Sequence, residues 1–224
     1  MRNWFFLLPS LAFAAQAAPP ARLEMAYEVT RNDLAVADIV QALEHGAGRY
    51  RLSEVWTGRG LFRLRGQIRR SSRGEVGPDG LRPLEYVDER TGRDTERASF
   101  DWKAKTVTYQ YDGPPSTIAL PPHPHDRLTF LYQFSFKPPR GQKVVLDVMD
   151  GRGISDQIYQ IEGRERFATA AGEFDALKLV RRKEGGERAE IWLATDRDYL
   201  PVRILIVAKD GTRLDQRVTR ISAP

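Results

Sequence analysis

The sequence predicts an all-β protein: a curled antiparallel sheet, or a partly open β-barrel, with one short helix near the middle of the chain. Apolar and polar residues alternate with a period of two through most of it, which is typical of strands that bury one face. Gly185-Gly186 and Asp210-Gly211 separate such runs in the second half and favour tight hairpin turns. Prolines at residues 120–124 interrupt the alternation, and helical spacing follows them.

The N-terminus has the pattern of a cleaved secretory signal. Arg2 precedes an apolar run at residues 4–14, and small residues follow where a signal peptidase requires them. The run is too short to span a bilayer, which needs about 20 residues. We therefore expect a signal peptide at residues 1–17 and a single all-β domain at residues 18–224, located in the periplasm with no integral membrane segment.

The charge of the chain is mildly basic and well mixed. It has 35 Lys and Arg against 30 Asp and Glu, and a formal net charge of +5. The most basic stretch, residues 63–73, has acidic residues close by, and its alternation favours the wet face of a strand over a phosphate-binding surface. With an export signal, this argues against nucleic acid as a partner. The absence of cysteine excludes disulfides, thiolate metal sites, a cysteine nucleophile and a lipid-modified cysteine.

Alternation defines the strands of the first half. Residues 22–30 and 49–56 each place apolar side chains on one face. Residues 61–68 are predicted as a strand with Phe62 on one face and the neighbouring arginines on the other. Residues 96–113 read as two strands that turn at Asp101 to Lys105.

Alternating runs continue to the end of the chain as an antiparallel meander. Turn signals, including Glu162-Gly163, separate them. The predicted strands are residues 143–150, 154–163, 174–182, 188–195, 200–209 and 212–221.

The stretch LPPHPHDRLTFLYQF, residues 120–134, predicts the one helix. From Asp126 the apolar residues are spaced three and four apart, and the Asp126 carboxylate can cap the free N–H groups of the first turn. Pro138-Pro139 then stops the helix. We expect a short amphipathic helix at residues 126–136, whose apolar stripe packs on the sheet.

Five ordered stretches resemble a known family. They are SRGEVGPDGLRPLEYVDER, FDW followed by VTY, LPPHPHDRLTFLYQF, TAAGEFDALKLVRR and IWLATDRDYLPVRILIVAKDG. Together they resemble the domain of unknown function 3108 (DUF3108) family of bacterial exported proteins. The resemblance implies an all-β envelope protein and no settled activity, and it transfers no catalytic residue set. Asp126 matches the family's Asp ahead of an apolar helix, whereas His123 and His125 are not part of that pattern.

Chemical motifs are few. His123, His125 and Asp126 are three neighbouring donors, but zinc sites need ligands held by a second shell, and the third histidine, His45, is remote in sequence. There is no G-x-S-x-G motif for a serine hydrolase. Carboxylate pairs such as Asp88-Glu89 are scattered through turns and strand edges. We expect no metal, no cofactor and no catalytic residue.

Binding is the favoured role. Large aromatic residues are spread over many strands, and a curled sheet would carry them on its concave face, where a small barrel holds an apolar ligand. We expect a lipid or another amphipathic partner there. An envelope-polymer hydrolase with paired carboxylates, or a scaffold that docks another envelope protein, stay as alternatives. The expected ligand-binding residues are Trp56, Phe62, Tyr86, Trp102, Tyr109 and Trp192.

Overall fold

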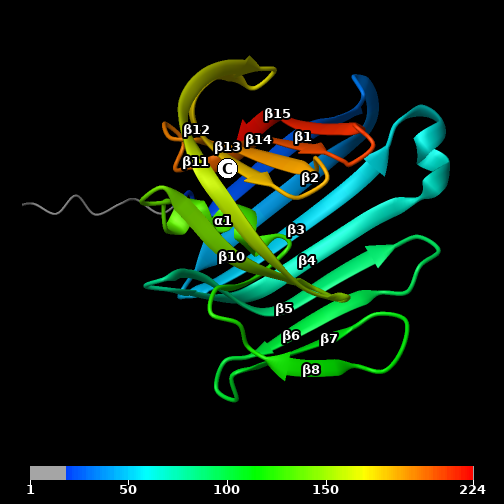
Figure 1. Ribbon diagram of the computed structural model, residues 1–224, viewed down its shortest axis with the longest axis vertical. Helices are drawn as coiled ribbons and strands as arrows, with labels where there is room; N and C mark the ends of the chain where they lie inside the picture. The colour runs from blue at the N-terminus through cyan, green and yellow to red at the C-terminus, as the bar shows by residue number, and fades with distance from the viewer. Residues whose placement is uncertain (1–18, 224) are drawn as a thin grey trace, which may run out of the picture.

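One β-sheet contains most of the chain. The computed structural model describes residues 19–223, so the predicted signal peptide lies outside the described residues. The described residues form fifteen strands, one 3-10 helix (η1) and one α-helix (α1). Figure 1 shows their arrangement. They are β1 (Arg22–Arg31), β2 (Leu34–Gly46), β3 (Arg49–Gly58), η1 (Gly60–Arg65), β4 (Gln67–Gly77), β5 (Gly80–Arg90), β6 (Glu96–Asp101), β7 (Thr106–Gln110), β8 (Ser116–Ala119), β9 (Pro124–Asp126), α1 (Thr129–Phe136), β10 (Lys143–Asp150), β11 (Gly153–Thr169), β12 (Gly172–Arg182), β13 (Arg188–Ala194), β14 (Leu200–Val207) and β15 (Arg213–Ser222).

The strands pair mainly with their neighbours in the chain. Strands β1 to β8 form one half of the sheet and β9 to β15 the other, and the pairing of β1 with β15 joins the halves at the centre. All pairs are antiparallel except β9 with β10. This arrangement confirms the predicted all-β class and the meander, whose hairpins need only short turns.

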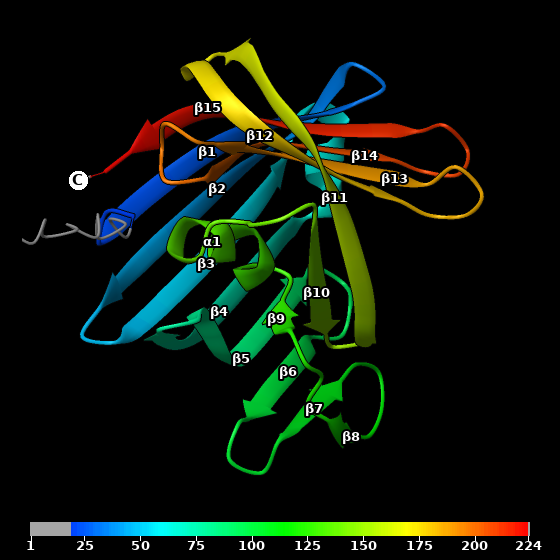
Figure 2. The ribbon, with the colours of Figure 1, turned by 60° about the vertical axis from the view of Figure 1, so that its left-hand side comes forward.

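The sheet curls until its two ends approach each other (Figures 1 and 2). Strand β9 contacts β5, β10 contacts β6, and α1 contacts both β5 and β14. Gly151 lies in the β10–β11 turn, and a Cβ atom there would overlap with the Glu96 side chain of β6. The concave side is therefore occupied by α1 and by strands β9 and β10.

The core lies between the concave face and these covering elements. The Tyr27 hydroxyl donates a hydrogen bond to the Pro201 carbonyl oxygen (2.8 Å), which links β1 to β14 inside the core. Burial of each large side chain stabilises the fold by about 1.5–3 kcal/mol. The largest fully buried side chains are Tyr27, Tyr86, Tyr132, Phe134, Met25, Ile39, Leu43, Leu52, Met149, Leu179, Ile191 and Leu193.

The predicted strand at residues 61–68 is wrong in its first part. Residues Gly60–Arg65 form η1, and β4 begins only at Gln67. The reason is local: Arg59 is fixed by ion pairs to Glu28 and Asp38, so the chain leaves the sheet there. Gly66, at φ +80°, then returns it to β4.

Two other boundaries differ from the prediction. The helix begins at Thr129 rather than at residue 126, because Pro124–Asp126 pair with β10 as the edge strand β9. Glu162-Gly163 is not a turn: β11 continues to Thr169, and the register shifts at Gly163 as in a β-bulge.

Candidate functional site

Three of the expected aromatic residues lie on the concave face. Tyr86 and Tyr109 belong to one cross-strand row, because both pair with Ala98 of β6. Trp56 lies on the inner face of β3, and its indole N–H donates to Glu54 (2.6 Å). Tyr86 is buried, while Tyr109 and Trp56 are half-buried against the core. A ligand role for these three residues stays a prediction.

The other three lie elsewhere and do not join them. Phe62 is on η1, outside the sheet, and Trp102 lies in the turn between β6 and β7. The Trp102 indole N–H donates to the Pro83 carbonyl oxygen (2.6 Å), and the Arg82 guanidinium stacks on its ring (4.4 Å). The six residues therefore do not form one binding surface.

Trp192 corrects the expectation that all six face inward. Ile191 pairs with Ile204, which pairs with Gln216, and Gln216 pairs with Val29 on the inner face of β1. Trp192 follows Ile191 and therefore points to the opposite face of β13. There its ring packs on Phe167, 6.2 Å between ring centroids.

A row of polar side chains crosses the inner face from β2 to β6. Each member lies directly opposite the next: Gln41, Glu54, Arg70, Asp88 and Glu96. All five are buried. Gln41 Nε2 donates to Glu54 Oε2 (2.6 Å), while Arg70 donates to Glu54 Oε1 (2.5 Å) and Asp88 Oδ2 (2.8 Å). Arg70 thus corrects the expectation that the arginines of residues 63–73 face solvent.

Two further guanidiniums balance the charge of this inner polar row. Arg90 donates to both carboxylate oxygens of Asp88 (3.0 and 2.6 Å), and Arg152 Nε donates to Glu96 Oε1 (2.7 Å). Burial raises the pKa of Asp88, but the hydrogen bonds from Arg90 and Arg70 outweigh it and hold that pKa below its usual value. With Arg70, three guanidiniums face three carboxylates, as a buried ion network requires.

Asp126 connects the start of α1 to the sheet. Its Oδ1 accepts hydrogen bonds from the N–H groups of Leu128 (2.8 Å) and Thr129 (2.9 Å), and its Oδ2 accepts one from the Ser72 hydroxyl (2.5 Å). Burial raises the pKa of Asp126 to about 6, even though these hydrogen bonds oppose the shift. The N-cap position itself is Leu128, so Asp126 acts from two residues before it.

A cleft of about 560 Å³ lies beside the end of α1. Leu81, Phe134 and Leu146 line it and are buried, and the half-buried Trp102 ring lines it too. Prolines on both sides of α1 add rigid apolar surface. Of the six expected binding residues, Trp102 lines this cleft.

Basic side chains from one segment also line the cleft. Lys137, Arg140 and Lys143 all line it and all are exposed. Lys137 Nζ pairs with Asp79 (2.7 Å), whereas Arg140 and Lys143 have no ion-pair partner among the described residues. Sequence reasoning missed this set, although three basic residues within seven, next to an apolar helix, were a usable signal.

One side of the cleft is fixed by Gln133. Its side-chain oxygen accepts from the Leu81 N–H (2.7 Å), and its nitrogen donates to the Asp79 carbonyl oxygen (2.6 Å). Gly80 has φ +94°, and a Cβ atom there would overlap with the Gln133 amide. Glycine is therefore required, and the β4–β5 turn is held tightly against α1.

His125 lines the cleft with its ring buried. Its Nδ1 atom has no hydrogen-bond partner among the described residues. Burial, and then the nearby His123, lower the pKa of His125 to about 4, so the ring is neutral at pH 7. No cluster of three metal-binding side chains occurs within residues 19–223. A neutral imidazole ring has one donor and one acceptor nitrogen, so it can form a hydrogen bond with a polar group of a ligand.

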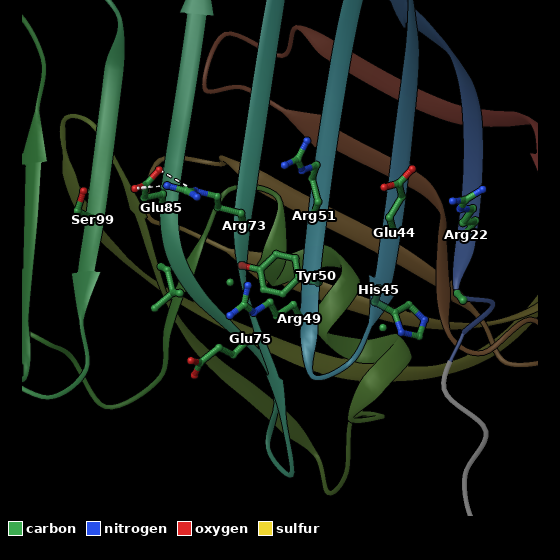
Figure 3. A pocket seen from close by; sticks show the side chains of 14 residues that line it. Arg22, Glu44, His45, Arg49, Tyr50, Arg51, Arg73, Glu75, Glu85 and Ser99 are labelled. Carbon is green, nitrogen blue, oxygen red and sulfur yellow. Dashed lines mark hydrogen bonds and ion pairs between the residues drawn. The ribbon is translucent and has the colours of Figure 1, made fainter.

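A second hollow, of about 720 Å³, lies on the outer face of the sheet, with α1 behind the sheet in the view of Figure 3. Charged side chains from successive strands cross it, each opposite the next. Arg73 donates twice to Glu85 (2.9 and 2.6 Å). This outer charged row consists of Arg22, Glu44, Arg51, Arg73 and Glu85.

Solved structures with a similar fold were found. A β-barrel-like protein of the domain of unknown function DUF1849 from Brucella abortus is 8% identical, with a TM-score of 0.60 over 92% of this chain and 99% of that chain. A protein from Parabacteroides distasonis, provisionally described as a lipoprotein, is 10% identical (TM-score 0.39; 92% and 96% covered). A protein from Bacteroides fragilis with a YmcC-like fold, provisionally described as exported, is 8% identical (TM-score 0.38; 92% and 97% covered). The first likeness supports the β-barrel-like fold.

Three further findings concern membrane-spanning helices, curated proteins and the family of the chain. Among the described residues, no helix has the length and apolar character needed to cross a membrane. No curated protein matches the chain. The model of one family matches residues 24–218, nearly the whole described sheet, in agreement with the resemblance of its ordered stretches. The chain belongs to this family, the proteins of unknown function DUF3108.

Proposed function

We propose that the chain is a non-enzymatic periplasmic protein that binds an amphipathic anion in the cleft beside Trp102. The observation that carries the proposal is the division of the cleft into two zones. Buried apolar side chains line one zone, and exposed basic side chains line the other. A lipid-like molecule with an acidic head has the same two parts.

The cleft has the size, and its apolar zone the surface, for a hydrocarbon chain. The volume of the whole cleft, about 560 Å³, falls within the range of small-molecule sites, about 300–1,000 Å³. Phe134 and Leu146 hold their positions in the core, so the site needs little ordering when a ligand enters. The Trp102 ring is fixed by its N–H bond and by Arg82, which gives the ligand a rigid aromatic surface.

The basic zone favours an anionic head group. Arg140 and Lys143 are not neutralised by a carboxylate among the described residues, so both charges are available to a ligand. The Lys137–Asp79 pair is exposed, and such pairs contribute little to stability. Lys137 can therefore exchange its carboxylate for that of a ligand. The neutral His125 ring offers a further polar contact.

A hydrolase is the less favoured reading. Glycoside hydrolysis by two carboxyl groups needs them about 5–10 Å apart across open space, with one protonated near neutral pH. Asp79 is the one carboxylate that lines the cleft, and Lys137 lowers its pKa. In the outer hollow, Arg73 likewise lowers the pKa of Glu85. Neither group is suited to donate a proton at pH 7.

Titration with 11-(dansylamino)undecanoic acid tests the proposal directly. We expect saturable fluorescence enhancement, about tenfold weaker binding after Arg140→Glu with Lys143→Glu, and a similar loss after Trp102→Ala. The control is Arg164→Glu with Lys209→Glu, which reverses two exposed charges away from the cleft. Equal affinity of the two charge variants, or no binding by the parent chain, would refute the assignment.

A further inference from the structure

The helix η1 carries the two most exposed large hydrophobic residues of the described chain. Leu61 is 84% exposed and Leu64 is 86% exposed. The other exposed large hydrophobic residues, apart from Leu34 at 63%, are at most 48% exposed. Isolated exposed leucines are common, but two on one short helix form a small exposed apolar patch.

The geometry of η1 directs both leucines the same way. Residues three apart eclipse each other in a 3-10 helix, so Leu61 and Leu64 share one side. Phe62 and Arg65 share another side, where the guanidinium lies 5.2 Å from the centre of the ring. Phe62 packs against the core, so it anchors the helix while the leucines project outward.

The base of η1 is firmly held. The Arg59 N–H donates to the Val36 carbonyl oxygen (2.8 Å), and the Arg59 side chain binds Glu28 and Asp38. On the other side, Gly66 packs directly against the Thr91 side chain. The leucines are thus presented by a fixed support and not by a loose loop.

Positive charge accompanies the exposed leucines. Arg63 and Arg65 are exposed, and neither has an ion-pair partner among the described residues. The β1–β2 turn, which precedes the exposed Leu34 at the start of β2, lies at the same end of the molecule in Figures 1 and 2, and β2 contacts η1. Asp33 in this turn is the nearest acidic residue in sequence to Leu34, so the end of the molecule is mixed, but η1 itself is purely basic.

We infer that η1 docks the protein on the surface of an anionic phospholipid membrane. Leu61 and Leu64 would enter the boundary between head groups and acyl chains, while Arg63 and Arg65 would contact the phosphates. A lipid surface fits better than a protein pocket, because the leucines protrude and the two arginines match a surface of many negative charges. This inference is independent of the cleft, with which η1 shares no lining residue.

Co-sedimentation with vesicles tests this docking. The chain is purified after export, so that the leader does not contribute, and mixed with vesicles of equal phosphatidylglycerol and phosphatidylcholine, or of phosphatidylcholine alone. We expect binding to the anionic vesicles only, weakened in 0.5 M NaCl. Leu61→Ser with Leu64→Ser should lower partitioning by at least about tenfold, and Arg63→Glu with Arg65→Glu should have a similar effect.

The matched control is Leu84→Ser with Ile158→Ser, which removes two exposed hydrophobic residues from strands β5 and β11. It should partition like the parent chain, and unchanged circular dichroism would verify that every variant is folded. Equal partitioning of the leucine variant and its control would overturn the inference. A second result would also overturn it: the parent chain does not bind vesicles but associates with itself, and the leucine variant no longer does so.

Discussion

The inner polar row and the outer charged row are built on the same strands, yet they differ in what surrounds them. Both rows run across β2 to β5 and follow the same pairing registers. Arg70 of the inner row is 9% exposed and its partner Asp88 is fully buried, whereas Arg73 of the outer row is 62% exposed. Both rows contain ion pairs, so we expect burial to decide how much the free energy of unfolding falls when a cation is removed from either row.

The same contrast separates the two hollows. The outer hollow is larger, but exposed charges that face water cross it, and one pair among them is already satisfied. The cleft beside Trp102 is smaller, but it has a buried apolar wall and two unpaired cations. A ligand that buries a hydrocarbon chain therefore gains more from the cleft.

Breaking the inner row should have the largest effect. Arg70→Met leaves Glu54 buried without its cation and removes one of the two guanidiniums that bind Asp88, so we expect a loss of about 3–5 kcal/mol in the free energy of unfolding. Urea denaturation measures it. Arg51→Met, which removes an exposed cation of the outer row that has no ion-pair partner among the described residues, should leave the unfolding midpoint where it is. Similar losses from the two variants would contradict the comparison.

The next effect concerns the proton on Asp126. Its pKa is about 6 in the folded chain, above its usual value near 4, so the folded state takes up a proton as pH falls from about 6 to about 4. The contribution of Asp126 to stability should therefore rise by up to about 3 kcal/mol as pH falls through this window, and be lost as pH rises through it. Urea denaturation at several pH values measures this, with Asp126→Asn as the reference.

His125 acts in the opposite direction: burial lowers its pKa to about 4, so its contribution to stability is lost as pH falls from about 6.5 to about 4, in the parent chain and in Asp126→Asn alike. The folded-state pKa of Asp88 and of Asp215 lies below the usual value, so their stabilisation is present above about pH 4 and is lost only in more acid solution. A parent chain and an Asp126→Asn variant with parallel pH profiles between 4 and 6 would show that Asp126 does not hold the proton.

A smaller effect should follow from crowding the end of the inner row. Gly151→Ala would force the β10–β11 turn away from Glu96, and we expect a loss of about 2 kcal/mol. Gly46→Ala is the control, because a Cβ atom there meets nothing within 4 Å and its φ is not positive. Thermal unfolding of both variants decides the point: equal melting temperatures would mean that the turn does not pack on β6.

The smallest effect is expected in the outer row. Arg73→Met removes the paired cation of Glu85, but both side chains are largely exposed. We expect a slight decrease in the urea midpoint at low salt, which disappears in 1 M NaCl because ions screen exposed pairs. A decrease that persists at high salt would show that the outer row is coupled as the inner one is.

Local sequence patterns predicted most of the strands, because one buried face leaves a visible alternation. These patterns failed in two places: a 3-10 helix showed the alternation of a strand, and a strand buried on both faces showed no alternation. Phe62, Leu64 and Ile68 read as one strand face, although Phe62 and Leu64 lie on a 3-10 helix. Trp192 gave no sign of its direction, because β13 is buried on both faces.

The candidate site was harder to predict than the fold. Trp102 was predicted as a binding residue and lines the cleft, but the cleft combines it with Leu81, Phe134 and Lys143, which come from distant parts of the chain. The inner polar row is also nonlocal, since its members are contributed by five strands. The pairing register brings such residues together, and it depends on the turn geometry of every hairpin between them.

We propose that the cleft beside Trp102 holds an amphipathic anion, and native mass spectrometry of the chain purified from cells without added ligand tests this most directly. We expect a population with the added mass of one acidic, lipid-like molecule, absent after Arg140→Glu with Lys143→Glu and present in the Arg164→Glu, Lys209→Glu control. A parent chain with only its own mass, or an adduct retained equally by both variants, would contradict it.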